Sequence, residues 1–260
     1  MFQVIARTGF CMVLAFCVLV SSQVRASAET VTVWVYHNFP PFVIDEDART
    51  GMSFDLAEML TRRSGGRYQF DVVVLPRQRL NDQLAFGAPG IVLWANPLWF
   101  GDADRVNYRW SNPLLNDSND VISPRTDPFT YAGPTSLDGS MLVGVKGHRY
   151  PDVDHLVTAG RVERMDVSSE AALVQFIASG RGNIGIVAHS AAVYYVQSYG
   201  LKDQVHFAPA PHSTYQRFIL VQPKLTDVHA FIQETLPMIA QSEDWRALLD
   251  LHEFVGAPTQ

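Results

Sequence analysis

Aromatic side chains follow two segments of this chain that are predicted to be β-strands, in loops that also contain proline and asparagine. The loops are His37-Asn-Phe-Pro-Pro-Phe42 and Trp94-Ala-Asn-Pro-Leu-Trp99. Ligands of open α/β sheets bind just outside the carboxyl ends of the strands, where such loops lie. Aromatic residues also fill cores, which we favour for Phe42 and Trp110. The loop residues that we predict to line a binding cleft are Phe39, Trp94, Asn96 and Trp99.

Isolated basic side chains accompany these loops, and they suit the recognition of a carboxylate. Arg77 follows a strand that ends at Pro76, and Arg105 comes shortly after the second aromatic loop. A guanidinium group pairs with a carboxylate through two parallel hydrogen bonds, although a solitary arginine is more often a solvated surface charge. We predict that the chain binds a small polar molecule bearing a carboxylate, with Arg77, Arg105 and His148-Arg149 near the cleft.

The sequence lacks the motifs of the common enzyme classes. It contains no phosphate-binding Gly-x-x-x-x-Gly-Lys-Ser/Thr loop, no Gly-x-Gly-x-x-Gly after a strand, no His-Glu-x-x-His and no Gly-x-Ser-x-Gly. Among the eight histidines, no pair is spaced to put two imidazoles on one helical face. Catalytic groups can still meet in space, so an enzyme is not excluded. We predict a protein that is not an enzyme and uses no cofactor or metal.

Composition limits the classes of partner. The chain has 260 residues, of which 47% are hydrophobic, and a formal net charge of −6. This length and apolar content allow one large domain or two of ordinary size, each with its own core. Nucleic-acid binding needs a concentrated positive field, so the acidic balance argues against a nucleic-acid partner.

The first 28 residues predict export from the cytoplasm. Arg7 precedes an apolar run over 10–20, and Ala26-Ser27-Ala28 has the small-x-small pattern of a signal-peptidase site. This run is about half as long as the roughly 20 residues that cross a bilayer, which argues against a membrane anchor. Both cysteines, Cys11 and Cys17, lie inside the segment, and Phe16 before Cys17 argues against a lipoprotein. We predict a cleaved signal peptide over 1–28 and a periplasmic location.

The remaining chain alternates between strand and helix patterns, which predicts an α/β fold. The first set of elements comprises strands at 31–36, 70–75 and 91–94 and helices at 54–63 and 79–86. A polar segment follows at 112–139, and then comes a second set. That set comprises strands at 141–145, 184–187 and 218–221 and helices at 151–159, 171–178, 191–199, 228–240 and 243–251. Two sets of alternating strands and helices, separated by a polar segment, predict two α/β lobes with a boundary near 112–124.

A series of short motifs runs through residues 31–255. They are Phe39-Pro-Pro-Phe42, Gly51-Met-Ser-Phe-Asp-Leu56, Gly101-Asp-Ala-Asp-Arg105, Trp110-Ser-Asn-Pro113, Gly144-Val-Lys-Gly147, Ser179-Gly-Arg181 before Ile184-Gly-Ile-Val187, and Asp244-Trp245. In type, order and spacing the series resembles the bacterial periplasmic solute-binding proteins of family 3, the amino-acid-binding type. Pro76-Arg-Gln-Arg79 and Gly147-His-Arg-Tyr150 are similar to a subgroup of that family.

The resemblance implies a two-lobed clamshell of the type II periplasmic-binding-protein class, with a mixed sheet in each lobe. The first lobe would comprise 29–119 with 220–260, and the second 120–219, joined by hinge segments near 120–124 and 215–221. The lobes would close on the ligand like a jaw. The protein would be a monomer that serves an inner-membrane ABC permease or a sensor domain.

The resemblance also implies roles for single residues. Phe39 would stack on the ligand, Arg105 would pair with a carboxylate, and Gly147 would open a helix N-terminus that offers N–H groups to an anion. His148, Tyr150 and His189 occupy further positions that we predict to contact the ligand.

The sequence departs from the family in places, and these departures leave alternatives open. No carboxylate stands near His189-Ser190, where the family has the acidic partner of a ligand ammonium group, so we do not expect a standard α-amino acid. One alternative is a clamshell enzyme of the cyclohexadienyl or prephenate dehydratase type, with His148 or His189 as acid or base. Another is an accessory protein that binds no ligand and uses the clamshell as an interaction surface.

Overall fold

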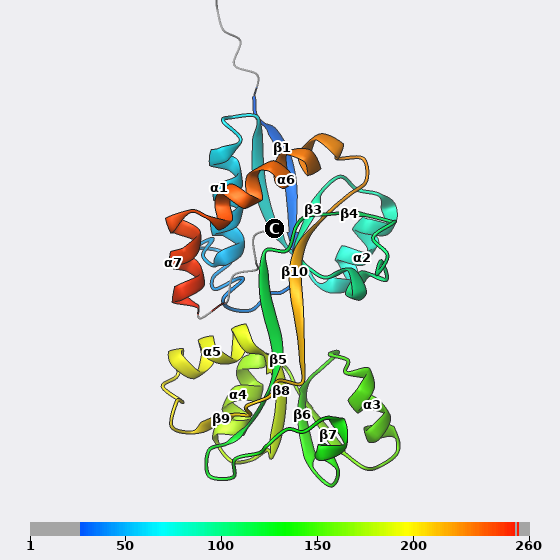
Figure 1. The fold of residues 1–260 in the computed structure, drawn as a ribbon, viewed down its shortest axis with the longest axis vertical. Helices are drawn as coiled ribbons and strands as arrows, with labels where there is room; N and C mark the ends of the chain where they lie inside the picture. The colour runs from blue at the N-terminus through cyan, green and yellow to red at the C-terminus, as the bar shows by residue number, and fades with distance from the viewer. Residues whose placement is uncertain (1–26, 253, 255–260) are drawn as a thin grey trace, which may run out of the picture.

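The computed structural model describes residues 27–252 and residue 254. The chain forms two lobes that lie end to end along the longest axis of the molecule, connected by two long strands (Figure 1). Nearly all of the predicted signal peptide, 1–28, lies outside the described residues. In the described part of the chain, no helix is long and apolar enough to cross a membrane.

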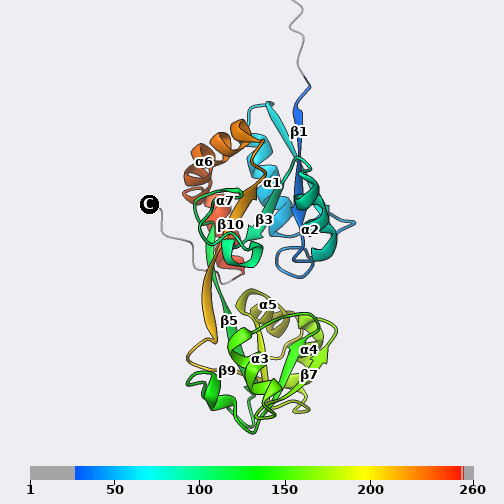
Figure 2. The ribbon, with the colours of Figure 1, turned by 90° about the vertical axis from the view of Figure 1, so that its right-hand side faces the viewer.

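Segments from both ends of the chain build the first lobe, whereas the second is built from its middle (Figures 1 and 2). The first contains β1 (Glu29–Val35), α1 (Met52–Arg63), β2 (Tyr68–Val74), α2 (Arg77–Phe86), β3 (Ile91–Ala95), η1 (Pro97–Phe100), β4 (Arg109–Trp110), α6 (Thr226–Ala240) and α7 (Glu243–Leu251). The second contains η2 (Pro134–Leu137), β6 (Met141–Val145), α3 (Pro151–Thr158), β7 (Glu163–Val167), α4 (Glu170–Ala178), β8 (Ile184–Ala188), α5 (His189–Ser198) and β9 (Val205–Phe207). The connecting strands are β5 (Leu115–Pro124) and β10 (Ser213–Val221).

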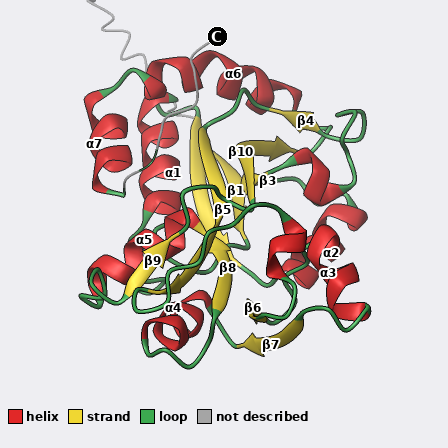
Figure 3. Cartoon of the chain, turned by 60° about the horizontal axis from the view of Figure 1, so that its bottom comes forward, coloured by secondary structure: helices red, strands yellow, loops and turns green. Residues whose placement is uncertain are grey.

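One path of paired strands runs through both lobes, in the order β2-β1-β3-β10-β5-β8-β6-β7 (Figure 3). β1 is parallel to β2 and β3, and β6 is parallel to β7 and β8. The first half of β10, 213–217, pairs antiparallel with 115–119 of β5, while its second half pairs with β3. The predicted two-lobed α/β architecture with mixed pairing is confirmed.

Each lobe buries side chains on both faces of its sheet. In β1, Val31, Val33 and Val35 pack into the core beneath α1, α6 and α7, whereas Trp34 packs on the opposite face with residues of α2. This alternation follows from the two-residue period of a strand. The second lobe has the same plan, with one core beneath α4 and α5 and another beneath α3. Covered faces explain why these strands are nearly continuous apolar runs.

The carboxyl ends of the parallel strands point toward the connection between the lobes. Ala95, the last residue of β3, pairs with Phe218, and Ala188, the last residue of β8, pairs with Asn119. Both partners stand at the ends of the ribbon that 115–119 and 213–217 form. Because strands β1 to β3 are parallel, and likewise β6 to β8, the loops after all six strands lie at the junction of the lobes.

The structure corrects the predicted hinge positions and adds strands. Residues 120–122 pair with β8 inside the second lobe, and 218–221 pair with β3 inside the first. The shared ribbon, 115–119 with 213–217, therefore ends before the first predicted segment and overlaps the second only at 215–217. The sequence did not predict β7, because this strand lies at the end of the sheet and alternates polar residues with partly buried ones. The lobe boundaries drawn from the sequence stay a prediction.

Gly51 fixes the loop that carries Phe39. Its φ of +121° lies in a region that favours glycine, and a Cβ there would come within 2.8 Å of the Phe42 carbonyl oxygen. The next two residues, Met52 and Ser53, donate backbone hydrogen bonds to the carbonyls of Pro41 and Phe42. The start of α1 is thereby fastened to the 39–42 loop.

We expect Gly51→Ala to lower the free energy of unfolding by about 3 kcal/mol, because it combines backbone strain with a clash against backbone atoms. Urea denaturation measures the loss. The matched control is Gly66→Ala, where φ is +91° but no atom lies within 4 Å of the added Cβ. The control should cost about 1 kcal/mol, from strain alone. Equal losses in the two variants would contradict the role given to Gly51.

Candidate functional site

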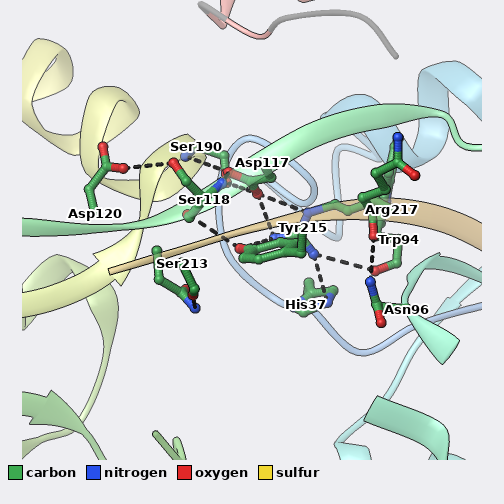
Figure 4. A network of polar contacts seen from close by, with 12 residues as sticks. His37, Trp94, Asn96, Asp117, Ser118, Asp120, Ser190, Ser213, Tyr215 and Arg217 are labelled. Carbon is green, nitrogen blue, oxygen red and sulfur yellow. Dashed lines mark hydrogen bonds and ion pairs between the residues drawn. The ribbon is translucent and has the colours of Figure 1, made fainter. Parts of the chain in front are cut away.

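A buried ion pair joins the two connecting strands at the junction of the lobes (Figure 4). Nε and Nη2 of Arg217 on β10 donate to Oδ2 of Asp117 on β5, at 2.9 and 2.6 Å. The side chains are 1% and 0% exposed, respectively. Losing one partner of such a pair leaves an uncompensated buried charge, so the two residues depend on each other.

The remaining N–H groups of Arg217 reach the first lobe and the ribbon itself. Nη1 donates to Nε2 of His37 at 3.1 Å and to the carbonyl of Trp94 at 3.3 Å, and Nη2 donates to the Tyr215 hydroxyl at 3.2 Å. With the two bonds to Asp117, each of the five guanidinium N–H groups has an acceptor.

Aromatic rings surround the same guanidinium group. Its carbon lies 4.6 Å from the ring centroid of Phe42, 5.1 Å from that of Tyr215 and 5.5 Å from that of Trp99. These distances are within the range of cation–π attraction. Arg217 is therefore a cation bound inside the protein by one carboxylate and three aromatic rings.

Asp117 extends this network into the second lobe. Its Oδ2 also accepts from the Ser190 hydroxyl at 3.0 Å, and its Oδ1 accepts from the backbone N–H of Ser118 at 2.9 Å. Three residues after Asp117 on β5, Asp120 pairs with Nδ1 of His189 and accepts from the Ser118 hydroxyl at 2.7 Å. Both carboxylates thus contact the first turn of α5.

This arrangement corrects one inference from the sequence. No acidic residue is adjacent to His189-Ser190 along the chain, but Asp117 and Asp120 approach both residues in space. β5 therefore places two carboxylates beside these residues, but Arg217 and His189 already engage them, and the expectation against a standard α-amino acid stays a prediction.

Two of the predicted aromatic residues, Phe39 and Trp99, lie at the junction of the lobes. Phe39 is partly buried and packs against the α1 core of the first lobe and also against the α4–α5 core of the second. Trp99 makes an edge-on contact with Tyr215 at 5.0 Å. Whether either of them contacts a ligand stays a prediction.

Three other predicted residues, Trp94, Tyr150 and Asn96, make contacts within the fold, and their contact with a ligand stays a prediction. The side chain of Trp94 is fully buried, stacks on Trp245 and donates to the Ser53 hydroxyl at 2.8 Å. Tyr150 is 5% exposed, and its hydroxyl donates to the carbonyl of Ile186 at 3.0 Å. The strand β3 is buried at every position, which explains why Trp94 points into the core.

The amide of Asn96 is also used within the fold. Its oxygen accepts from the backbone N–H of Leu98 and caps η1, and its nitrogen donates to the carbonyl of Gln216 on β10 at 2.9 Å. Asn96 therefore holds the loop that carries Trp99 against the connecting ribbon.

The predicted basic residues differ in their surroundings. Arg77 donates to the carbonyl of Trp99 and lies over the rings of Tyr36 and Phe100, so it positions the Trp99 loop. Arg105 is exposed, with its guanidinium carbon 4.7 Å from the ring centroid of Phe218. Among the described residues Arg105 has no acidic partner, and its pairing with a ligand carboxylate stays a prediction.

Gly147 does not open a helix, contrary to the prediction. It forms an exposed turn with φ of +90°, and α3 begins only at Pro151, which has no N–H to offer. The neighbouring His148 is 44% exposed and lies 3.6 Å from Glu170. Burial lowers the pKa of His148, although Glu170 acts in the opposite direction.

The residues predicted for the site do not include Arg217, Asp117 or Tyr215. Arg217 stands directly before the apolar run Phe218–Val221, and a charged residue within a buried strand is an informative signal. Asp117 lay in a polar segment that resembled a loop, so nothing in its local pattern marked it as buried.

Comparison with known proteins rests on structure alone, since no protein-family model and no curated protein sequence matches the chain. An ancestral arginine-binding protein bound to arginine is 14% identical, with a TM-score of 0.67 over 87% of this chain and 99% of that chain. A histidine kinase sensor domain with similarity to periplasmic binding proteins is 15% identical, with a TM-score of 0.67 over 89% and 99% of the two chains. The chain has the periplasmic-binding-protein fold.

A third neighbour with this fold is a putative L-cystine ABC transporter protein from Listeria monocytogenes. It is 15% identical, with a TM-score of 0.65 over 86% of this chain and 96% of that chain. These neighbours of the binding-protein fold are binding proteins and a sensor domain rather than enzymes. The predicted type II clamshell is confirmed as the fold.

We expect Arg217→Met to lower the free energy of unfolding by about 3–5 kcal/mol, because it leaves the Asp117 carboxylate buried without its cation. Adding Asp117→Asn to this variant should recover part of the loss, since the orphaned charge is then gone. The control is Arg49→Met, which breaks an ion pair with Asp71 whose side chains are both 53% exposed. It should cost about 1 kcal/mol or less. Urea denaturation that showed equal losses for Arg217→Met and Arg49→Met would contradict this role.

His37 should make the stability depend on pH. Burial, followed by the nearby Arg217, holds the pKa of His37 well below 6.5 in the folded protein. Below about pH 6.5 the unfolded chain therefore binds a proton that the folded protein does not, and acid favours unfolding. The free energy of unfolding should fall by up to about 1.4 kcal/mol per pH unit for this group between pH 6.5 and the folded pKa.

His37→Gln tests this, because the glutamine oxygen can still accept from Arg217 and does not titrate. Urea denaturation at pH 7 and pH 5 should show a smaller loss of stability on acidification than in the wild type. Some loss should remain, because burial also lowers the pKa of His148 and His252. An unchanged pH dependence in His37→Gln would refute the assignment.

Proposed function

We propose that the chain is a monomeric periplasmic solute-binding protein that captures a small polar molecule bearing a carboxylate. Residues 1–28 direct its export as a signal peptide and are then cleaved. The solute, an amino-acid-like compound or an aromatic acid, is held between lobes formed by 29–119 with 220–260 and by 120–219. The protein then presents it to an ABC-type transporter or to a sensor in the inner membrane. The chain performs no catalysis.

The observation that carries this proposal is the meeting of loops from both lobes at one junction. The loops after β1 and β3 bring Phe39 and Trp99 from one side, and the loops after β6 and β8 bring His148 and His189 from the other. His148 is near enough to contribute, after burial and Arg217, to the lowered pKa of His37 across the junction. Convergent polar and aromatic groups of this kind are typical of small-molecule sites at domain interfaces.

Arg105 supports the choice of a carboxylate. The described part of the chain gives its guanidinium group a ring to stack on, Phe218, but no carboxylate and no hydrogen-bond acceptor. Its N–H groups are therefore available to a solute, whereas those of Arg77 and Arg217 are engaged.

The structural neighbours support capture for transport or sensing. They include an arginine-binding protein, a putative L-cystine ABC transporter and a histidine kinase sensor domain. Each uses the same two-lobed fold, which suits a protein that holds a solute and then delivers it or signals its presence.

A thermal-unfolding screen of the purified protein with amino acids, aromatic and aliphatic carboxylates, polyamines and sugars tests the proposal. A carboxylate-bearing compound at a hundredfold excess over its Kd should stabilise the protein by about 2.7 kcal/mol, a shift of several degrees. Phe39→Ala should weaken binding of the identified compound roughly tenfold, through the loss of aromatic contact. Arg105→Ala should weaken the binding of compounds that carry a carboxylate and leave the binding of other compounds unchanged.

The control for this screen is Phe86→Ala, since Phe86 at the end of α2 is 91% exposed. It should leave the affinity unchanged. Two results would argue against the proposal: no shift with any compound, or turnover of prephenate-like acids in place of a stable one-to-one complex.

A further inference from the structure

The imidazole of His37 fits its place at the junction only without a proton on Nε2. This nitrogen faces Nη1 of Arg217 at 3.1 Å. A guanidinium group has five N–H donors and no acceptor, so Nε2 must accept the hydrogen bond through its lone pair. Asp117 on β5 binds other N–H groups of the same guanidinium, on Nε and Nη2. A proton on Nε2 would break the bond to Arg217 and put two cations in contact.

The charged groups around His37 also oppose its protonation. After burial, which is the largest cause, Arg217 acts from β10, His148 from the loop after β6 and Arg77 from α2. The carbonyl of Trp94 at the end of β3 acts in the opposite direction. Together these groups hold the pKa of His37 well below 6.5. One of them, His148, belongs to the second lobe, so the state of the junction affects His37.

Aromatic rings enclose the imidazole, and one of them also packs across the junction. The ring centroid of His37 lies 4.0 to 5.9 Å from those of Tyr36, Phe39, Phe42 and Trp99. Phe42 is fully buried, whereas Phe39 is partly buried and packs against cores of both lobes. When the lobes part, Phe39 loses its contact with the second lobe and His148 moves away. Water then reaches His37, and a group that opposes its protonation is gone.

We propose that protonation of His37 opens the two lobes. The imidazole takes up a proton in water when the lobes are parted and stays neutral when they are closed. Below about pH 6.5, each further pH unit therefore shifts the equilibrium up to tenfold toward the open form. This inference goes beyond the proposed function and rests on it only for its consequence, which is that acid releases the solute.

Energy transfer between two fluorophores measures the separation of the lobes without any solute. Residues 29–260 contain no cysteine, so the labels can be attached at Asp47→Cys in the first lobe and Lys202→Cys in the second, both at exposed positions. The transfer should fall as the pH is lowered from 7 to 5. In the same labelled protein with His37→Gln it should keep its pH 7 value, because the glutamine oxygen accepts from Arg217 and does not titrate.

The matched control is His155→Gln, which removes an exposed histidine from α3 and should open like wild type. Circular dichroism of the same samples should show the full helix signal at pH 5. Three results would overturn the inference: constant transfer in the wild type, an equal fall in His37→Gln, or a fall that accompanies loss of helix and so reports unfolding. Low transfer in His37→Gln already at pH 7 would assign the imidazole a packing role and would also overturn it.

Solute binding separates this inference from the proposed function. A compound identified by the thermal-unfolding screen should bind the wild type up to tenfold more weakly for each pH unit below about 6.5, and His37→Gln should bind it nearly equally at pH 7 and pH 5. Equal affinities of the wild type at both pH values would refute release by acid and leave solute capture standing. If no compound binds, solute capture fails, whereas the energy transfer still decides whether protonation opens the lobes.

Discussion

The ion pair between Arg217 and Asp117 is the interaction on which the rest of the junction depends. A buried guanidinium group is tolerated only when its N–H groups are all engaged, and the acceptors of Arg217 come from β5, β10, the loop after β1 and the end of β3. Asp117 also connects this network to the start of α5, because it accepts a hydrogen bond from the Ser190 hydroxyl. The pair is satisfied only when segments far apart in the sequence are all in place, so it ties the connecting ribbon to residues of both lobes.

The location of this pair on the ribbon also bears on how the lobes can move. The contacts that cross between the lobes away from the ribbon include the packing of Phe39 against the second lobe and the ring contact of Tyr194 with His252 at 6.4 Å. Separating rings exposes apolar surface but leaves no buried charge behind. Separating Arg217 from Asp117 would leave two buried charges without a partner. The lobes can therefore rotate about the ribbon at a lower cost, because the polar network stays intact. Separating β5 from β10 would break that network and costs more.

The sequence predicted the elements well and the site only in part, for a physical reason. Strand and helix periodicities are local, so the helices at 171–178 and 243–251 could be placed from neighbouring residues. The side-chain environment at the junction is not local. The sequence placed Trp94 in a binding loop, but the residue lies within β3, where its ring contacts Ser53 and Trp245 in the core. The carboxylates near His189 come from a strand about seventy positions earlier, as the contact of His189 with Asp120 shows.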